Sequence, residues 1–492
     1  MDKLTHITLT QLQRRWLWGF LALAGILRLV MLFEIPFTDT TEARYAEIAR
    51  KMVETGDWMT PQFDYGVPFW GKPPLHTWVS ALGMKLFGVG QFGARIFIFL
   101  TAIATVWMLY AWARSYKGRD YALAGIVILS STALFYLASA TVMTDLVMAS
   151  GVFLSMAGFY VAVTGHKHAR LWSYLFFVGL GIGMLAKGPV AVVLTGIPIG
   201  MWVLLKNRWR DTWRQLPWIE GSLLSACIFL PWYVGAEIKT PGFIEYFILG
   251  EHWHRFLDSG WTGDLYGHGH AETRGTIWVF WLAAVLPWSF FFLAPLRWGR
   301  RVYRGLVIEA DGWSLYLLCW ALSPMLFFTL ATNIIATYVI TGLPAACFLV
   351  IDLWRFAGEG VQVPKPGVAR FYVATVSVAV CLFALVCGAV YVGGASVVKK
   401  SQKYLIEDIN QMRGTSGGQI YYLDKRYYSA EFYAEGQVHT IESIDGIETI
   451  LHNDARDFLV IRKSRMDQLP ADFDTKFKLQ GIYAKDALYY EL

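Results

Sequence analysis

The sequence predicts a polytopic α-helical membrane protein with a small α/β domain at its C-terminal end. Of its 492 residues, 55% are apolar and only 16% are charged, whereas soluble domains carry roughly 25% charged residues. About eleven apolar runs are long enough to cross the ~30 Å hydrocarbon layer of a bilayer. This composition excludes a soluble enzyme, a disordered chain and a fibrous repeat, and the net charge of +6 gives no reason to expect nucleic acid as a partner.

The expected spans come from windows of sustained hydropathy. The first follows two arginines and lacks a small-residue cleavage site, so we interpret it as a retained anchor rather than a signal peptide. In chain order the expected spans are 16–36, 92–112, 121–139, 145–164, 171–187, 188–205, 218–236, 275–296, 312–331, 334–353 and 370–394.

Short basic loops set the orientation. They recur every second span, from the arginines before the first span to the basic loop after residue 353. The positive-inside rule places that face in the cytoplasm. The long loops at 37–91 and 237–274 and the tail then lie outside. We therefore expect a membrane domain over 1–394 and an outer domain over 395–492.

The tail has the pattern of a small α/β domain. Short alternating runs predict strands at 418–423, 457–461, 477–483 and 487–492, and 444–451 reads as a helix. The tail shows no motif that carries chemistry.

The first outer loop has the densest pattern of polar residues. A helix is expected from Thr40 or Thr41 to Thr55, with Gly56 ending it. Its apolar stripe suggests that it lies along the membrane surface, facing the spans or lipid. Asp39 and Glu42 stand at its start, where the positive helix end favours carboxylates. Helix capping is the alternative role for this pair.

This loop resembles a known family. The run Glu42–Arg50 (EARYAEIAR), followed by Gly56-Asp57-Trp58 and Gly71–Pro74 (GKPP), is similar to the aminoarabinose transferases of lipid A. These are GT-C glycosyltransferases that use polyprenyl-phosphate sugars, and they are related to the protein O-mannosyltransferases. Weaker later matches extend the resemblance over most of the membrane region: Asp145, Leu185–Gly188, Glu251-His252, Arg255-Phe256 and Tyr338.

The sequence departs from the family pattern at two positions. Thr41 stands where the family usually has Asp, so the assignment of a base between Asp39 and Glu42 stays open. Gly71 stands where a Glu often precedes the Lys-Pro, so a metal contact made there in relatives is not carried over.

The resemblance implies a GT-C fold and an inverting transferase in the bacterial inner membrane with its active site facing the periplasm. It would move a sugar from an undecaprenyl-phosphate carrier to lipid A or a related envelope acceptor. Two alternatives are a protein O-glycosyltransferase with the same type of donor and a lipid or sugar transporter. No internal repeat supports transport, and the charges gather in the outer loops. The identity of the sugar stays open.

Transfer from a lipid phosphate needs a base or electrostatic partner for the acceptor, cations for the departing phosphate and a dry groove for the prenyl chain. The catalytic candidates are Asp39, Glu42 and Asp145. Asp145 stands in an apolar boundary, where an unpaired carboxylate is costly. A span-end cap is its alternative role.

Four cations are candidates for the donor phosphate: Arg44, Lys72, Lys187 and Arg255. The rigid Gly-Lys-Pro-Pro segment presents Lys72, and the fork of Arg44 can grip two phosphate oxygens. The alternative role of Arg44 is an exposed ion pair with Glu47 or Asp39. The alternative role of Lys187 is that of a span-end residue whose ammonium reaches the membrane interface.

Tyrosines and histidines complete the candidates. Tyr45, Tyr65 and Tyr338 are expected in the sugar or lipid pocket, with an interfacial aromatic belt as the alternative. A divalent metal is left open as a cofactor, with candidate ligands Glu251, His252, His268 and His270. Solvated loop histidines are the competing interpretation. Arg28, inside the first span, is expected to brace the bundle by pairing with Glu34 or another carboxylate.

Overall fold

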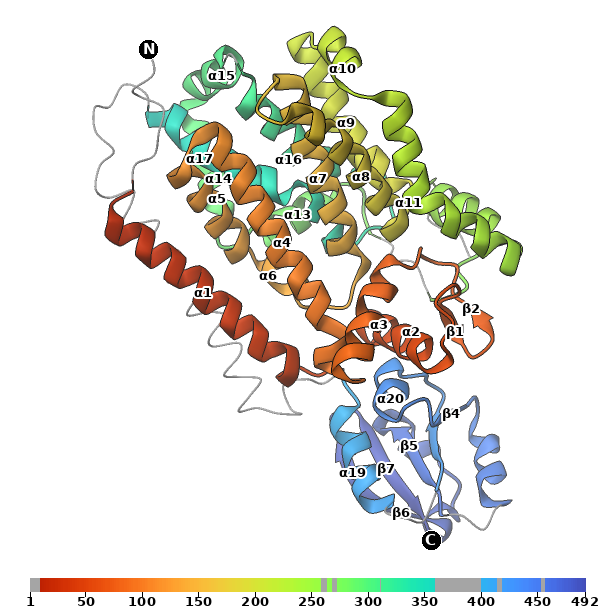
Figure 1. Ribbon diagram of the computed structural model, residues 1–492. Coiled ribbons are helices and arrows are strands. Elements are labelled where there is room, and N and C mark those ends of the chain that lie inside the picture. Colours follow the sequence, from red (N-terminus) through yellow and green to blue (C-terminus); the bar gives the residue numbers. More distant parts are fainter. Residues whose placement is uncertain are drawn as a thin grey trace.

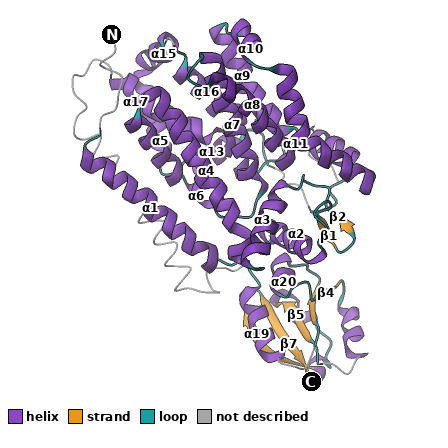
Figure 2. Ribbon diagram, in the orientation of Figure 1, coloured by secondary structure: helices purple, strands orange, loops and turns teal. Residues whose placement is uncertain are grey.

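The computed structural model describes residues 9–257, 263–267, 272–309, 311–358, 400–413, 418–452 and 456–492. Figure 1 shows a bundle of helices with a small sheet at one end, beyond α2 and α3. In Figure 2 the labelled strands are confined to that end of the described molecule, in a two-stranded hairpin and a separate sheet.

The described helices of the bundle are named here in chain order. They are α1 (Gln11–Glu34), α2 (Thr41–Thr55), α3 (Leu75–Phe87), α4 (Gln91–Lys117), α5 (Arg119–Ser131), α6 (Ala133–Ala138), α7 (Thr144–Thr164), α8 (Ala169–Lys187), α9 (Val190–Lys206), α10 (Trp209–Gln215), α11 (Trp218–Lys239), α12 (Arg255–Leu257), α13 (Thr276–Ala284), α14 (Ser289–Leu293), α15 (Gly299–Ile308), α16 (Trp313–Phe328) and α17 (Leu343–Gly358). A π-helical segment, η1 (Glu245–His254), precedes α12, and two 3-10 segments, η2 (Ala294–Trp298) and η3 (Ala336–Gly342), precede α15 and α17.

The chain is a multi-pass membrane protein. Among the described residues, six helical segments are long and apolar enough to cross a bilayer, and a bent pair formed by α15 and α16 makes a seventh if it is one span. The six are α1, α4, α7, α8, α11 and the continuous segment Ala336–Ala357. All lie at runs that the sequence predicts. The expected span at 370–394 lies outside the described residues.

Two of the expected spans are interrupted. The run 121–139 divides at Thr132 into α5 and α6, and the run 275–296 divides near Pro287, which has no N–H to donate. The two interruptions meet, because the Ala133 N–H donates to the Leu286 carbonyl at 2.9 Å. The Trp288 indole also donates to the Ser131 hydroxyl at 2.9 Å. Each break thus supplies hydrogen-bond partners to the other.

Helix α2 begins and ends where the sequence predicts, with Gly56 in the left-handed conformation at φ 70°. The expectation that it lies along the membrane surface stays a prediction, but the polar side of α2 is covered by protein. Its charged residues Glu47, Arg50 and Lys51 are buried because α2 packs between α3 and the C-terminal helix α20 (Tyr428–Tyr433). The Thr40 hydroxyl makes no capping hydrogen bond.

The C-terminal residues form an α/β unit. Its strands are β3 (Ile420–Leu423), β4 (Val438–Ile441), β5 (Phe458–Arg462), β6 (Phe477–Tyr483) and β7 (Asp486–Glu491), in the order β4-β3-β5-β7-β6. Strand β3 is parallel to β4 and β5, whereas β7 is antiparallel to β5 and β6. The remaining elements are α19 (Lys403–Arg413), α20, α21 (Phe473–Lys476) and the 3-10 segments Ile444–His452 and Lys463–Gln468.

The expected strands near 418, 457, 477 and 487 correspond to β3, β5, β6 and β7. Strand β4 was not predicted, and 444–451 is a 3-10 segment rather than an α-helix. The expected domain boundary at 394/395 lies outside the described residues.

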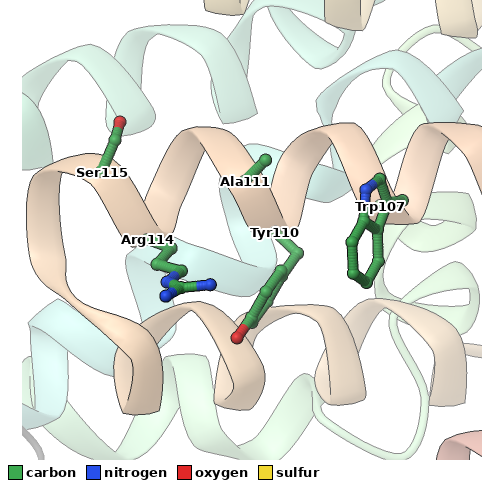
Figure 3. Close-up of a pocket in the computed structure, with 5 residues that line it drawn as sticks. All are labelled: Trp107, Tyr110, Ala111, Arg114 and Ser115. Carbon is green, nitrogen blue, oxygen red and sulfur yellow. The ribbon is translucent and has the colours of Figure 1, made fainter.

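A second feature of the bundle is a shallow cavity on α4. Its volume is about 320 Å³, and Figure 3 shows its lining residues Trp107, Tyr110, Ala111, Arg114 and Ser115. They lie in the C-terminal half of α4. Trp107 is largely exposed, so this cavity opens on the outer surface of the bundle.

Candidate functional site

A buried ion pair joins the start of α7 to the end of α8. The Lys187 ammonium lies 2.6 Å from the Asp145 carboxylate, and both side chains are buried. The two helices form an antiparallel hairpin, so the first turn of α7 and the last turn of α8 meet at the same end. The same ammonium lies 4.4 Å from the centre of the Tyr338 ring, close enough for a cation–π contact.

Glycines fix the geometry of this pair by letting α7 and α8 approach closely. A Cβ at Gly151 would lie 2.6 Å from the Gly179 carbonyl oxygen, and a Cβ at Gly179 would lie 2.4 Å from that of Gly151. Small residues at such interfaces are the usual means of close helix packing in membranes.

A second cluster surrounds Glu251 on η1. The Lys72 ammonium lies 2.6 Å from one carboxylate oxygen, and the Arg255 guanidinium lies 3.0 and 3.1 Å from the two oxygens. The Tyr246 hydroxyl donates to the same carboxylate at 3.3 Å. Burial opposes ionisation, but the charges of Lys72 and Arg255 outweigh it and lower the pKa of Glu251 to about 2. Glu251 is therefore an anion at any physiological pH.

His76, at the start of α3, lies between the two clusters. Its side chain is fully buried, and its ring meets the edge of the Tyr45 ring at 4.8 Å. Burial and the nearby Lys72 charge lower its pKa to about 3, and Asp145 and Lys187 also act on it electrostatically. A neutral imidazole thus stands among three charged groups contributed by three different segments of the chain.

Further contacts join the clusters. A Cβ at Gly188, directly after Lys187, would lie 3.1 Å from the His252 ring. Tyr45 and Tyr338 both act electrostatically on Lys187, and Tyr338 also acts on Arg255. The structure therefore brings together most of the predicted site residues: Tyr45, Lys72, Asp145, Lys187, Glu251, His252, Arg255 and Tyr338.

Two predicted acids have other partners. The Asp39 carboxylate accepts hydrogen bonds from the Ser429 N–H at 3.1 Å and from the Ser429 hydroxyl. The Glu42 carboxylate accepts two hydrogen bonds from Arg95 of α4, each at 2.8 Å, and one from the Val142 N–H at 3.1 Å. These contacts attach the start of α2 to the C-terminal unit and to the bundle.

The other predicted residues are distributed around α2. Arg44 donates to the Tyr266 carbonyl at 2.5 Å and lies over the Tyr45 ring. This backbone acceptor differs from the carboxylates of Glu47 and Asp39, which were its alternative partners, and its role at the donor phosphate stays a prediction. Tyr65 is half exposed and hydrogen-bonds Arg50 and Glu54.

The expected pairing of Arg28 of α1 with Glu34 or another carboxylate stays a prediction. The Arg28 guanidinium donates to the Leu137 carbonyl and lies over the Tyr136 ring. Leu137 lies near the C-terminal end of the short helix α6, where carbonyl groups lack an α-helical N–H partner and can accept other hydrogen bonds.

The described residues do not fit the expected metal site. No group of three or more His, Cys, Asp or Glu side chains in the described part of the chain could hold a metal ion. Glu251 is engaged by two cations, and the His252 Nδ1 donates to the Phe247 carbonyl at 2.8 Å. His268 and His270 lie outside the described residues. We therefore assign no step to a metal.

Two residues of the site were missed by the sequence analysis. His76 stands four positions after Lys72, in the first turn of the helix that follows the two prolines. That spacing is the signal that would have found it. Tyr246 precedes Glu251 by five residues, a spacing that places two side chains together in a π-helix and not in an α-helix.

Comparison with known proteins adds to this geometry. Residues 18–247 match the model of the dolichyl-phosphate-mannose-protein mannosyltransferase family. The curated undecaprenyl phosphate-α-4-amino-4-deoxy-L-arabinose arabinosyl transferase of Enterobacter sp. (strain 638) is 27% identical over 350 residues, 69% of this chain and 59% of that protein. The transferase of the same name from Aeromonas salmonicida (strain A449) is 29% identical over 70% of this chain and 60% of that protein.

Solved structures share the fold. ArnT from Cupriavidus metallidurans bound to undecaprenyl phosphate superposes with a TM-score of 0.77 at 18% identity, over 97% of this chain and 98% of that one. The chain therefore shares the fold of ArnT. The fold is also shared more distantly with the oligosaccharyltransferase AglB from Archaeoglobus fulgidus, at a TM-score of 0.52 and 10% identity, over 93% of this chain and 70% of that one.

The fold shared with ArnT accounts for the arrangement of long spans and a small sheet at one end. The chain spans about 60% of the length of the curated relatives that it matches. The resemblance noted in the first outer loop thus extends to the whole described architecture, while the activity of those relatives stays a matter for proposal.

Proposed function

We propose that this protein transfers a sugar from a polyprenyl-phosphate carrier to lipid A or a related envelope acceptor, on the periplasmic side of the bacterial inner membrane. The observation that carries the proposal is the convergence of Lys72, Lys187 and Asp145 around buried His76, with Arg255 sharing the Glu251 carboxylate with Lys72. Cations from separate segments at one end of a membrane bundle suit a lipid phosphate. Relatives named as undecaprenyl-phosphate arabinosyl transferases support the same donor class.

We assign the donor phosphate to Lys72 and Arg255, which are partly exposed, with Lys187 behind them. As the bond from sugar to phosphate breaks, negative charge grows on the phosphate oxygens, and cations already in place stabilise it. The Nη1 of Arg255 already donates to both oxygens of the Glu251 carboxylate, at 3.0 and 3.1 Å, so the guanidinium can bind an oxyanion at this point.

We assign the acceptor side to Asp145. Its carboxylate is held by Lys187 and stands in an apolar setting, so it is positioned to orient the attacking group or take its proton. Tyr45 and Tyr338 stand beside Lys187 and would line the sugar. Asp39, Glu42 and Arg44 serve in this proposal to place α2.

A protein acceptor is the second candidate. It is favoured by the match of residues 18–247 to a family of protein mannosyltransferases. Both candidates use the same donor chemistry and differ only in the group that attacks the sugar.

The test is transfer by the purified full-length protein in lipid vesicles. Undecaprenyl-phosphate-linked aminoarabinose is offered with lipid A or with a serine- and threonine-rich peptide, and mass spectrometry follows the added mass. We expect a mass-shifted lipid A and a loss of about 100-fold or more in Asp145→Asn. The control is Asp467→Asn on the exposed surface of the C-terminal unit. A mass-shifted peptide alone favours the second candidate, and full transfer by folded Asp145→Asn contradicts the site.

A further inference from the structure

The carboxylate of Glu251 occupies the point where the two exposed phosphate-binding cations meet. Lys72 comes from the first outer loop, Arg255 from α12 and Glu251 from η1. Both cations contact the same carboxylate at hydrogen-bond distance. The Glu251 side chain is only 3% exposed, whereas Lys72 and Arg255 are 17% and 22% exposed. The cations are accessible to a ligand, and their present counter-ion lies behind them.

The charges around this point already balance. Lys72, Lys187 and Arg255 are cations, and three carboxylates face them. Glu251 and Asp145 are described above, and Asp264 lies 3.4 Å from Arg255. A lipid phosphate that contacts Lys72 and Arg255 adds negative charge beside Glu251. Like charges in a poorly solvated site repel strongly, so the phosphate and the carboxylate compete for the same two cations.

We propose that the Glu251 carboxylate occupies the binding position of the donor phosphate. It binds Lys72 and Arg255 until the phosphate arrives and then releases them. The inference rests on the proposed function, in which these cations bind a polyprenyl phosphate. Carboxylate and phosphate are both oxyanions that accept paired hydrogen bonds from Arg, so one can replace the other on the same donors.

The displaced carboxylate has a partner on its own helical segment. The Tyr246 hydroxyl donates to one Glu251 oxygen, while Lys72 holds the other. The Leu265 N–H donates to the same hydroxyl at 3.2 Å and orients it. Glu251 keeps the Tyr246 hydrogen bond when it releases the cations. The segment is π-helical, a geometry that recurs at functional positions and hinges.

The exchange has a consequence for turnover. After the sugar leaves, the carrier phosphate stays bound to Lys72 and Arg255, and the returning carboxylate helps to displace it. Glu251 thus weakens phosphate binding and speeds product release. If Glu251 only positioned Lys72 and Arg255, its removal would weaken phosphate binding instead of strengthening it.

The experiment measures the affinity of the purified full-length protein for undecaprenyl monophosphate, in wild type and in Glu251→Gln. Undecaprenol, which lacks the phosphate, and inorganic phosphate are offered separately. The matched control is Glu245→Gln, which removes a charge from an exposed position of the same π-helical segment. We expect Glu251→Gln to bind undecaprenyl monophosphate about tenfold more tightly than wild type, with no gain for undecaprenol and no change in Glu245→Gln.

A second variant covers the case in which Glu251→Gln fails to fold. Tyr246→Phe removes the hydroxyl that receives the displaced carboxylate, so we expect it to bind undecaprenyl monophosphate several-fold more weakly. Unchanged binding in Tyr246→Phe, or weaker or unchanged binding in folded Glu251→Gln, overturns the exchange while the proposed function stands. Failure of the wild-type protein to bind undecaprenyl monophosphate overturns the proposed function, and the exchange with it.

Discussion

At the scale of single residues, Asp39 shows how a buried charge is held at the junction of α2 and the C-terminal unit. Its N–H donates to the Lys400 carbonyl at 2.9 Å, and its carboxylate accepts from Ser429. Burial raises its pKa to about 6, in spite of the hydrogen bonds from Ser429 and the charge of Lys425, which act in the opposite direction. Burial of the ionised Asp39 carboxylate lowers the free energy of unfolding. The pH dependence of that free energy can therefore be used to measure the effect.

The first prediction follows from that pKa. The unfolded carboxyl ionises near pH 4 and the folded one near pH 6, so the folded state holds more protons between these values. Stability therefore falls as the pH rises from 4 to 6, by about 3 kcal/mol at most. Asp39→Asn lacks this component. We expect the difference in stability between wild type and Asp39→Asn, measured by thermal unfolding from pH 4 to pH 8, to change with pH only below about pH 7. Parallel curves would contradict the assignment.

At the scale of elements, α7 and α8 carry the ion pair of Asp145 and Lys187, and their glycines set how closely the two backbones approach. Helix α2 is held differently. Its Lys51 lies 3.7 Å from Glu431 of α20, and Arg426, just before α20, binds Asp64 in β1 (Gln62–Asp64) at 2.5 Å. One element is therefore placed by close backbone packing and the other by paired charges.

The second prediction tests the close packing. In Gly179→Ala the new methyl group would meet the Gly151 carbonyl at 2.4 Å. We expect a loss of about 1–3 kcal/mol in stability and a fall in transfer activity, because the helices must separate and the ion pair with them. Thermal unfolding and the transfer assay measure the two effects. The control is Gly196→Ala on α9, where no atom lies within 4 Å of the added group. Equal behaviour of the two variants would show that the packing does not place the site.

At the scale of the whole molecule, α2 and α3, which carry Tyr45 and His76, lie next to the C-terminal unit (Figure 1). The Asp39, Lys51 and Arg426 contacts tie the sheet-bearing unit to α2, and α2 presents Tyr45 to the site. In the predicted orientation both face the outer side of the membrane. The basic loops near α10 and α15 belong to the opposite side in the predicted orientation.

The third prediction concerns that orientation. Single cysteines replace Asp467 in the C-terminal unit and Trp213 in α10, both exposed, in a variant without the five native cysteines. A membrane-impermeant maleimide should label Asp467→Cys in intact spheroplasts, and Trp213→Cys only after the membrane is opened. The reverse pattern would invert the proposed orientation.

The sequence by itself determined the membrane-embedded class, the positions of the six long apolar spans, the bounds of α2 and four of the five described C-terminal strands. These depend on local hydropathy, period and capping glycines, which each short stretch of sequence carries within itself. It also supplied Lys72, Asp145, Lys187, Glu251 and Arg255 as candidates. Asp145 was conspicuous as a charge at an apolar boundary, and all five stand in the segments that resemble the transferase family.

Only the tertiary structure decided which charge meets which. Glu42 pairs with Arg95, 53 positions away, and Asp39 meets Ser429, 390 positions away. Partners at such distances are set by packing, and no local pattern contains them. Burial is decided in the same way: the charged face of α2 looks solvated in the sequence, but α20 covers it and pairs its charges. A buried charge is stable only beside its partner, so the fold, which chooses the partners, also decides which acids are left for chemistry.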